Sequence, residues 1–130
     1  METFKVNILG CGSAKPTTRH MPTAQIVDFR SKYFMLDCGE GAQVQMQRMG
    51  LSMLRIGHIF ITHNHGDHVF GLPGLISTMA LLGRTAGLYI HGPKEIEGFL
   101  SCILSTYCEG IGFKVEFIPV DPTSHSLIYE

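Results

Sequence analysis

The segment THNHGDHVFGLPG carries three histidines and an aspartate within six residues, and all four are types of side chain that bind metals. These residues are His63, His65, Asp67 and His68. Neutral imidazole and ionised carboxylate are ligands of Zn²⁺ and related divalent ions. In an extended segment, the i, i+2 spacing of His63 and His65 aims both rings to the same side. Past the flexible Gly66, Asp67 and His68 can turn toward a second point, so the spacing favours two adjacent metal ions.

Two ligands per ion do not complete a catalytic metal site. Catalytic zinc usually has three protein ligands, and a two-metal site also needs a bridging group. Four other histidines have no neighbouring ligand in the sequence, and none is assigned to the metal: His20, His58, His91 and His125. Because His58 and His91 flank or end predicted strands, a structural role is favoured for both. Further ligands must come from elsewhere.

Asp37 closes an apolar run at the start of the segment DCGEG. Its carboxylate could accept backbone N–H bonds within the turn. Alternatively, it could orient a ligand histidine, since metal sites usually contain such a supporting acceptor. The spacing favours neither interpretation, and both stay open at this point.

A layered α/β scaffold is expected to position these residues. Alternating or apolar runs bounded by turn residues predict strands at 4–10, 23–29, 32–39, 58–62, 87–92 and 113–120. Helix formers with Pro near the start or Gly at the end predict helices at 42–49, 72–82 and 93–109. The strand at 32–39 is nearly all apolar and is expected to be buried on both faces, while HSLIYE at 125–130 begins another strand. The histidine loop follows a strand, and α/β sites collect at strand ends.

Composition indicates one globular domain. The chain has 130 residues, 45% of them hydrophobic, which is enough for a single core. Its net charge of −1 excludes a sequence-wide cationic surface, so any polyanion site must be local. The four cysteines have neither CxxC spacing nor the density of a disulfide scaffold, which predicts reduced thiols and a cytoplasmic protein. No apolar run reaches the roughly 18 residues of a membrane span.

With these residues placed, the chain resembles the metallo-β-lactamase superfamily and, within it, the ribonuclease Z family of tRNA 3′-processing endoribonucleases. Four segments carry the resemblance in order: ILGCGSAKPTTRHMPTAQ, FMLDCGEGAQVQMQRM, IFITHNHGDHVFGLPGL and LYIHGP. HNHGDH indicates the superfamily, and DCGEGAQ and FGLPG narrow it to the family. The resemblance implies the α/β fold of that superfamily, a four-layer αββα sandwich truncated here to its N-terminal portion. Residues 1–130 would then be the N-terminal part of a single metallo-β-lactamase-like domain.

The resemblance also implies roles for the histidine loop. His63 and His65 would bind one zinc ion and Asp67 and His68 the other, with two Zn²⁺ per complete site. Asp67 would also be the catalytic general base for the attacking water. The family places its remaining ligands, and the arm that grips the tRNA elbow, downstream of these segments. His20 stands where the family commonly has Asn, which affects expected substrate contacts. Asn64 stands where the family commonly has Leu between the first two histidines, which removes no ligand.

The expected enzyme is therefore a zinc-dependent phosphodiesterase that removes the 3′ trailer of precursor tRNA. The resemblance implies a cytoplasmic homodimer without membrane association, and we expect the 130-residue chain alone to be inactive. One alternative is another hydrolase of the superfamily, acting on an ester or lactone. Another is a non-catalytic fragment that serves as a metal-binding or assembly module. Turnover of precursor tRNA against small esters, together with metal stoichiometry, distinguishes the three.

Overall fold

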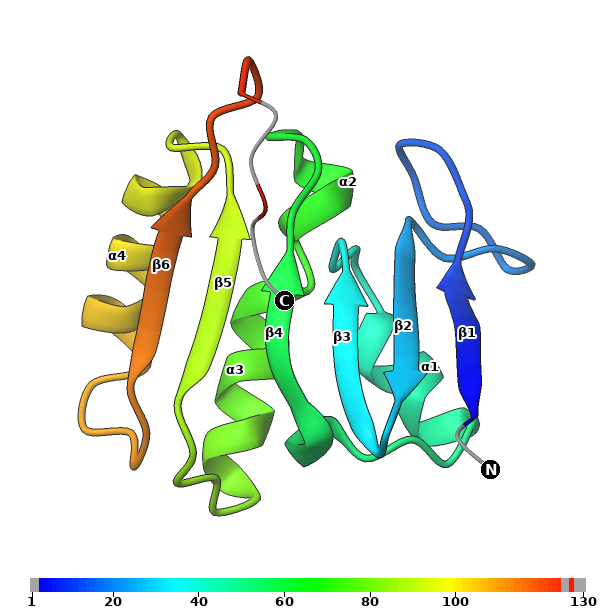
Figure 1. The fold of residues 1–130 in the computed structure, drawn as a ribbon, viewed down its shortest axis with the longest axis horizontal. Helices are drawn as coiled ribbons and strands as arrows, with labels where there is room; N and C mark the ends of the chain where they lie inside the picture. Colours follow the sequence, from blue (N-terminus) through cyan, green and yellow to red (C-terminus); the bar gives the residue numbers. More distant parts are fainter. Residues whose placement is uncertain (1–2, 125–126, 128–130) are drawn as a thin grey trace.

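A single six-stranded sheet organises the chain (Figure 1). The computed structural model describes residues 3–124 and 127. The strands are β1 (Phe4–Gly10), β2 (Ala24–Phe29), β3 (Lys32–Leu36), β4 (Ile56–Phe60), β5 (Leu88–Gly92) and β6 (Val115–Pro119). The helices are α1 (Ala42–Arg48), the short 3₁₀ helix η1 (Met53–Arg55), α2 (Gly66–Val69), α3 (Leu72–Leu81) and α4 (Ile96–Tyr107).

The strands lie in the sheet in sequence order, and the pairing changes from antiparallel to parallel at β3. β1, β2 and β3 pair antiparallel, whereas β3, β4, β5 and β6 pair parallel. The β2–β3 hairpin turns at Arg30 and Ser31, which both have positive φ (52° and 64°) as two-residue hairpin turns require. Helical segments make the parallel connections. As a result, the carboxyl ends of β1 and β3–β6 point to the same edge of the sheet.

Helices α1, α3 and α4 all cover the same face of the sheet (Figure 1). The core lies between them and the inward side chains of the strands, such as Ile26, Met35, Ile59 and Ile90, each fully buried. Among residues 3–124 and 127, the layers are therefore one of helices and one of sheet. These are two of the four layers that the resemblance implies. None of the helices in this part of the chain is long and apolar enough to cross a bilayer.

Every strand and helix expected from the pattern at 4–120 is present; β1 has the expected bounds, and the other elements have shifted boundaries. The strand expected at 58–62 runs at Ile56–Phe60, and the last one is shorter, at Val115–Pro119. The helix expected to begin at Pro93 begins at Ile96, because residues 93–95 form a turn closed by the Ile96 N–H donating to the carbonyl of Pro93 (3.0 Å). Helix α2 lies where a loop was expected. The strand expected to begin at 125 lies outside the described residues.

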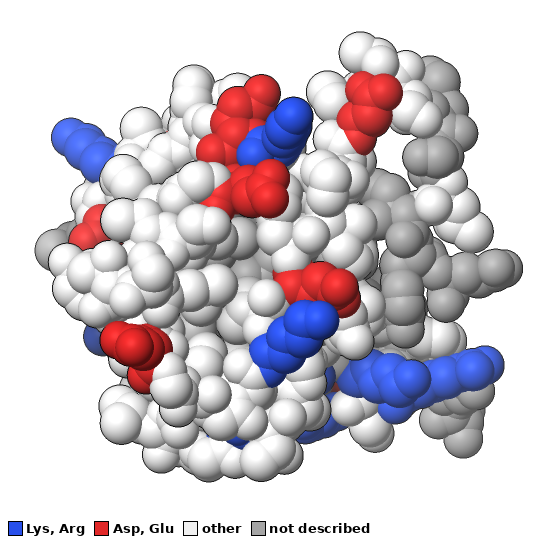
Figure 2. Space-filling view, turned by 90° about the vertical axis from the view of Figure 1, so that its left-hand side faces the viewer, with Lys and Arg blue, Asp and Glu red and all other residues white. Residues whose placement is uncertain are grey.

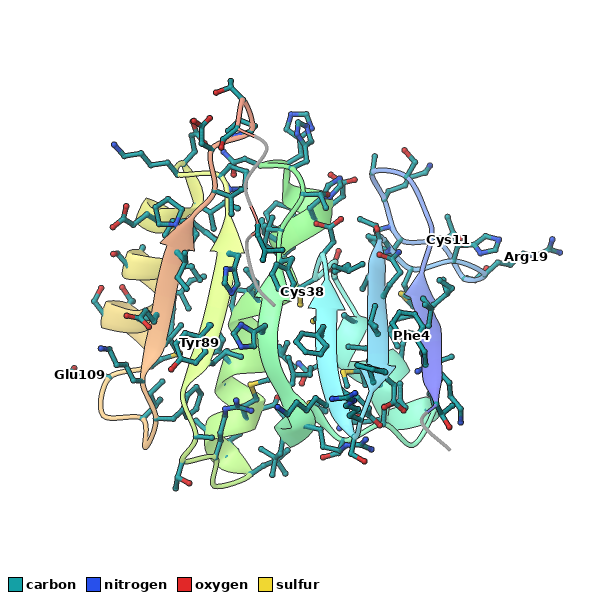
Figure 3. The ribbon with its side chains drawn as sticks, in the orientation of Figure 1. Phe4, Cys11, Arg19, Cys38, Tyr89 and Glu109 are labelled. Atoms are coloured by element: carbon teal, nitrogen blue, oxygen red, sulfur yellow. The ribbon has the colours of Figure 1, made fainter. Side chains whose placement is uncertain are left out.

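The expectation that the strand at 32–39 is buried on both faces is wrong. In β3, Tyr33 and Met35 are buried under the helices, whereas Phe34 and Leu36 on the opposite face are only half-buried. The physical reason is that helices cover one face of the sheet only. Phe34 belongs to an apolar open face that extends from Phe4 in β1 to Tyr89 in β5 (Figure 3).

Two histidines lie side by side on the open face, on adjacent strands. The Nδ1 atom of His58 is 3.0 Å from the Nε2 atom of His91, and the His91 ring stacks on Phe60 with 4.6 Å between centroids. The structural role expected for both residues fits these contacts. However, the Nδ1 atom of His91 is buried without a hydrogen-bond partner among the described residues. Burial lowers the pKa of both imidazoles, aided by Lys32 at His58 and by His58 at His91.

We predict that this pair makes the fold acid-sensitive. Because the folded chain lowers both pKa values, it binds fewer protons than the unfolded chain, so stability falls as the pH drops below about 6.5. His91→Phe, which preserves the ring stack, should flatten the dependence of the free energy of unfolding on pH. Denaturant titrations between about pH 7.5 and pH 5.5 measure the free energy of unfolding at each pH. His20→Gln, on an exposed loop, is the control, and an unchanged slope in His91→Phe contradicts the prediction.

Candidate metal centre

Three loops meet at the carboxyl-end edge of the sheet and build the candidate site. They are residues 11–22 after β1, 37–41 after β3 and 61–71 after β4. Backbone hydrogen bonds join the second and third loops: the Cys38 N–H donates to the carbonyl of His68 (2.8 Å), and the Gly71 N–H donates to the carbonyl of Cys38 (2.9 Å). The Ala14 N–H donates to Oδ2 of Asp67 (3.3 Å) and ties in the first loop. The site is thus assembled from segments far apart in the sequence.

Asp37 is the central connection between these loops. Its carboxylate is buried and accepts hydrogen bonds from the backbone N–H of Thr62 (2.8 Å) and from the Thr62 hydroxyl (2.8 Å). Its Oδ2 atom also lies 3.0 Å from Nδ1 of His68. The second interpretation of Asp37 fits these contacts, because its carboxylate orients a histidine, whereas the backbone N–H that it accepts belongs to Thr62 and not to its own turn. Its positive φ of 60° turns the chain sharply out of β3.

The four candidate ligands come together as two pairs. The Nε2 atom of His63 lies 3.0 Å from Nδ1 of His65, and nitrogen atoms this close can share an ion or a proton. The Nε2 atom of His68 lies 3.6 Å from Oδ2 of Asp67. Because Asp37 engages Nδ1 of His68, the Nε2 atom is the one left to face a ligand. Both donor sets, two imidazoles in one and an imidazole with a carboxylate in the other, fit zinc chemistry.

The described part of the chain contains no group of three or more His, Cys, Asp or Glu side chains arranged to hold a metal ion. His20 lies on the first loop, with Nδ1 3.7 Å from Sγ of Cys11, and His125 lies outside the described residues. Cys38 sits between the loops, but burial raises the pKa of its thiol, so it stays protonated and is a poor ligand.

Sequence reasoning missed the part that Thr62 plays. Its hydroxyl bridges the two groups that position the site, lying 2.8 Å from Oδ2 of Asp37 and 3.3 Å from Nδ1 of His68. The only available signal was its position directly before His63. The contact of Ala14 with Asp67 was not predictable either, because it is made by a backbone N–H.

Glycines permit the close approach of the loops. A Cβ on Gly71 would lie 2.2 Å from the carbonyl oxygen of Gly39, and one on Gly39 would lie 2.8 Å from the carbonyl oxygen of Asp67. Both contacts are with backbone atoms that cannot move aside without shifting a loop. Gly39 of DCGEG and Gly71 of FGLPG are thus required by packing.

A family sequence model described as "Anti-Pycsar protein Apyc1" matches residues 4–102, more than half of the chain. The chain belongs to this family. It is also a homologue of ribonuclease Z. The protein of that name from Parabacteroides distasonis is 58% identical over 130 residues, which are 100% of this chain and 43% of the relative. Ribonuclease Z from Phocaeicola vulgatus is 55% identical over the same length, covering 42% of that relative.

Solved structures support the same assignment. Human tRNase Z, short form, superposes with a TM-score of 0.79 at 32% identity, covering 94% of this chain and 47% of the human chain. The metallo-β-lactamase fold protein YhfI from Bacillus subtilis matches with a TM-score of 0.70 at 19% identity, covering 93% of this chain and 48% of that one. The chain therefore has part of the metallo-β-lactamase fold and corresponds to the N-terminal portion of ribonuclease Z. It spans about two fifths of the length of the curated relatives it matches.

Because the loops approach each other closely, we predict that one methyl group added at Gly71 lowers the stability of the fold. Gly71→Ala places a Cβ against the carbonyl of Gly39, so it should destabilise the fold by about 1–3 kcal/mol, as overpacking does. Gly98→Ala is the matched control, because its Cβ meets nothing within 4 Å inside α4. That control should stabilise by about 0.5–1 kcal/mol through helix propensity. Urea denaturation measures both, and equal stabilities for the two variants contradict the prediction.

Proposed function

We propose that this chain supplies part of the active site of a zinc-dependent endoribonuclease that removes the 3′ trailer of precursor tRNA. The observation that carries the proposal is the paired arrangement of four ligand-type side chains, braced by Asp37, in a homologue of ribonuclease Z. Each zinc would be held by one pair, His63 with His65 or Asp67 with His68. Residues 1–130 form the N-terminal part of one domain in this proposal, and the same resemblance extends it to a cytoplasmic homodimer.

Zinc bound there supplies Lewis acidity, which polarises a phosphoryl oxygen and lowers the pKa of a water molecule. The chain's own residues do the rest. The carboxylate of Asp67 accepts the proton of the attacking water, and the Ala14 N–H holds that carboxylate in place. Asp37 and Thr62 fix the ring of His68, so that its Nε2 atom is the one left to bind zinc.

The names of the matched family model and of the matched relatives point to two different activities. The length and identity of the matches favour the ribonuclease. The "Anti-Pycsar" description belongs to a model that matches residues 4–102, whereas the ribonuclease Z relatives align with all 130 residues at 55–58% identity. An ester or lactone hydrolase and a non-catalytic metal-binding module are the competing outcomes of the experiments below.

Removing either half of the ligand set should remove metal and activity together. His65→Ala or His68→Ala, in the complete protein, should each lose zinc and nearly all cleavage of precursor tRNA. Elemental analysis gives the zinc content, and gel assays follow release of the 3′ trailer. His20→Ala, on the neighbouring loop, is the control and should keep the zinc. Wild-type turnover with full zinc in both ligand variants would refute the assignment of these residues as ligands. If the complete wild-type protein hydrolyses small esters but not precursor tRNA, the alternative of an ester or lactone hydrolase is favoured.

Asp67 should matter more to the rate than to the fold. Asp67→Asn keeps an oxygen that can accept the Ala14 N–H, but it cannot take a proton from water. We expect kcat to fall by about 10²–10⁴-fold, the usual contribution of a general base, with little change in Tm. Steady-state kinetics and thermal unfolding of the complete protein measure the two effects. An unchanged kcat accompanied by a lower Tm assigns Asp67 a structural role instead.

A further inference from the structure

The edge of the sheet opposite the histidine loop is basic. Lys32 is the first residue of β3, Arg55 directly precedes β4, and Lys114 directly precedes β6. Arg84 lies in the connection that leads into β5. Because these four strands are parallel, their amino ends meet along one edge, and each end carries a cation. Lys and Arg side chains gather along the lower side of the molecule in Figure 2, where this edge lies.

Three of these cations line one cavity of about 270 Å³. They are Lys32, Arg55 and Arg84, and no Asp or Glu is among the described lining residues. Tyr33 and Phe34 form other parts of its wall, with the guanidinium of Arg55 stacked 4.0 Å from the centroid of the buried Tyr33 ring. Gly57 leaves room within it, since a Cβ there would meet nothing within 4 Å. The cavity therefore combines positive charge with aromatic surface.

Arg84 brings a buried charge to the cavity, and no carboxylate pairs with it among residues 3–124 and 127. It is 6% exposed, and its guanidinium donates to the carbonyls of Ala86 (2.9 Å), Leu54 (3.2 Å) and Gly87 (3.0 Å). These acceptors are neutral, so they satisfy hydrogen bonds and leave the net charge in place. A buried ion without a counterion is unfavourable, and burial accordingly lowers the pKa of Arg84. An anion in the cavity would offset this cost.

The neighbouring groups leave the cavity positive overall. Arg55 lies 3.5 Å from the carboxylate of Asp28, which balances one charge. Lys32 is exposed next to the β2–β3 turn and adds a positive charge to the cavity. His58 also lines the cavity. Burial is the main cause that lowers the pKa of His58, and the positive charge of Lys32 lowers it further.

We propose that this edge binds the phosphate backbone of RNA, with one phosphodiester in the cavity between Lys32, Arg55 and Arg84. The inference rests on the proposed function, which makes RNA the substrate. Cations at the starts of successive strands provide the positive charge by which an RNA backbone is bound, and the half-buried Phe34 lies beside them in the wall of the cavity. The chain has a net charge of −1, so the attraction comes from this local arrangement and not from total charge.

Salt-dependent binding of a short fluorescent oligouridylate to the 130-residue chain tests the proposal. Lys32→Gln should weaken binding severalfold and reduce the slope of log Kobs against log salt by about 0.7, the loss of one contact with a single strand. Lys94→Gln makes the same charge change at the opposite edge, beside Glu95, and should leave the slope unaltered. Lys32 is exposed, so its replacement should preserve the fold, which circular dichroism checks. Arg84 is left intact because it holds three backbone carbonyls.

Equal slopes for the Lys32 and Lys94 variants would overturn the proposal. Tighter binding of polyglutamate than of oligouridylate, at matched charge, would overturn it too, because it would indicate an acidic protein partner. The probe has no tRNA trailer, so binding is measured independently of cleavage. A complete enzyme that binds oligouridylate through Lys32 but does not cleave precursor tRNA would therefore contradict the proposed function and support this edge as an RNA surface.

Discussion

The buried carboxylate of Asp37 is the interaction on which the rest of the site depends. A buried carboxylate is unfavourable unless it is fully hydrogen-bonded, and Asp37 reaches that state only when Thr62 and His68 are both in place. Folding of the β3 and β4 ends is thereby coupled to the orientation of one candidate ligand. The glycines at 39 and 71 allow the backbones to come close enough for this contact.

Parallel strands give the sheet two chemically different edges. At the carboxyl ends, loops after β1, β3 and β4 bring together imidazoles and carboxylates. At the amino ends, the chain enters each of β3–β6 beside a cation. The proposed metal centre at one edge and the proposed RNA-binding edge at the other would be compatible on one molecule. Their separation by the length of the strands would keep the cations from repelling metal ions bound at the histidine loop.

The open face of the sheet and the paired candidate ligands can both accept further contacts. Helices cover one face, while the other presents exposed Phe4, Val6 and Ile8 and the stacked rings around His58. Exposed apolar surface of this kind marks an interface. The chain spans about two fifths of its curated relatives, and each candidate zinc position has two ligands from the described residues. Both the face and the ligand sets are therefore open to further partners.

The sequence by itself determined the element order and the candidate ligands, because both are local properties. Hydrophobic period and turn residues locate strands and helices, and the spacing of His63 and His65 requires only an extended backbone. Tertiary structure decided what local patterns do not encode. It showed that one face of β3 is open, that Asp37 and Thr62 brace His68, and that cations at four strand starts meet at one edge. These features depend on which strands are neighbours and on which face the helices pack, and no short stretch of sequence specifies either.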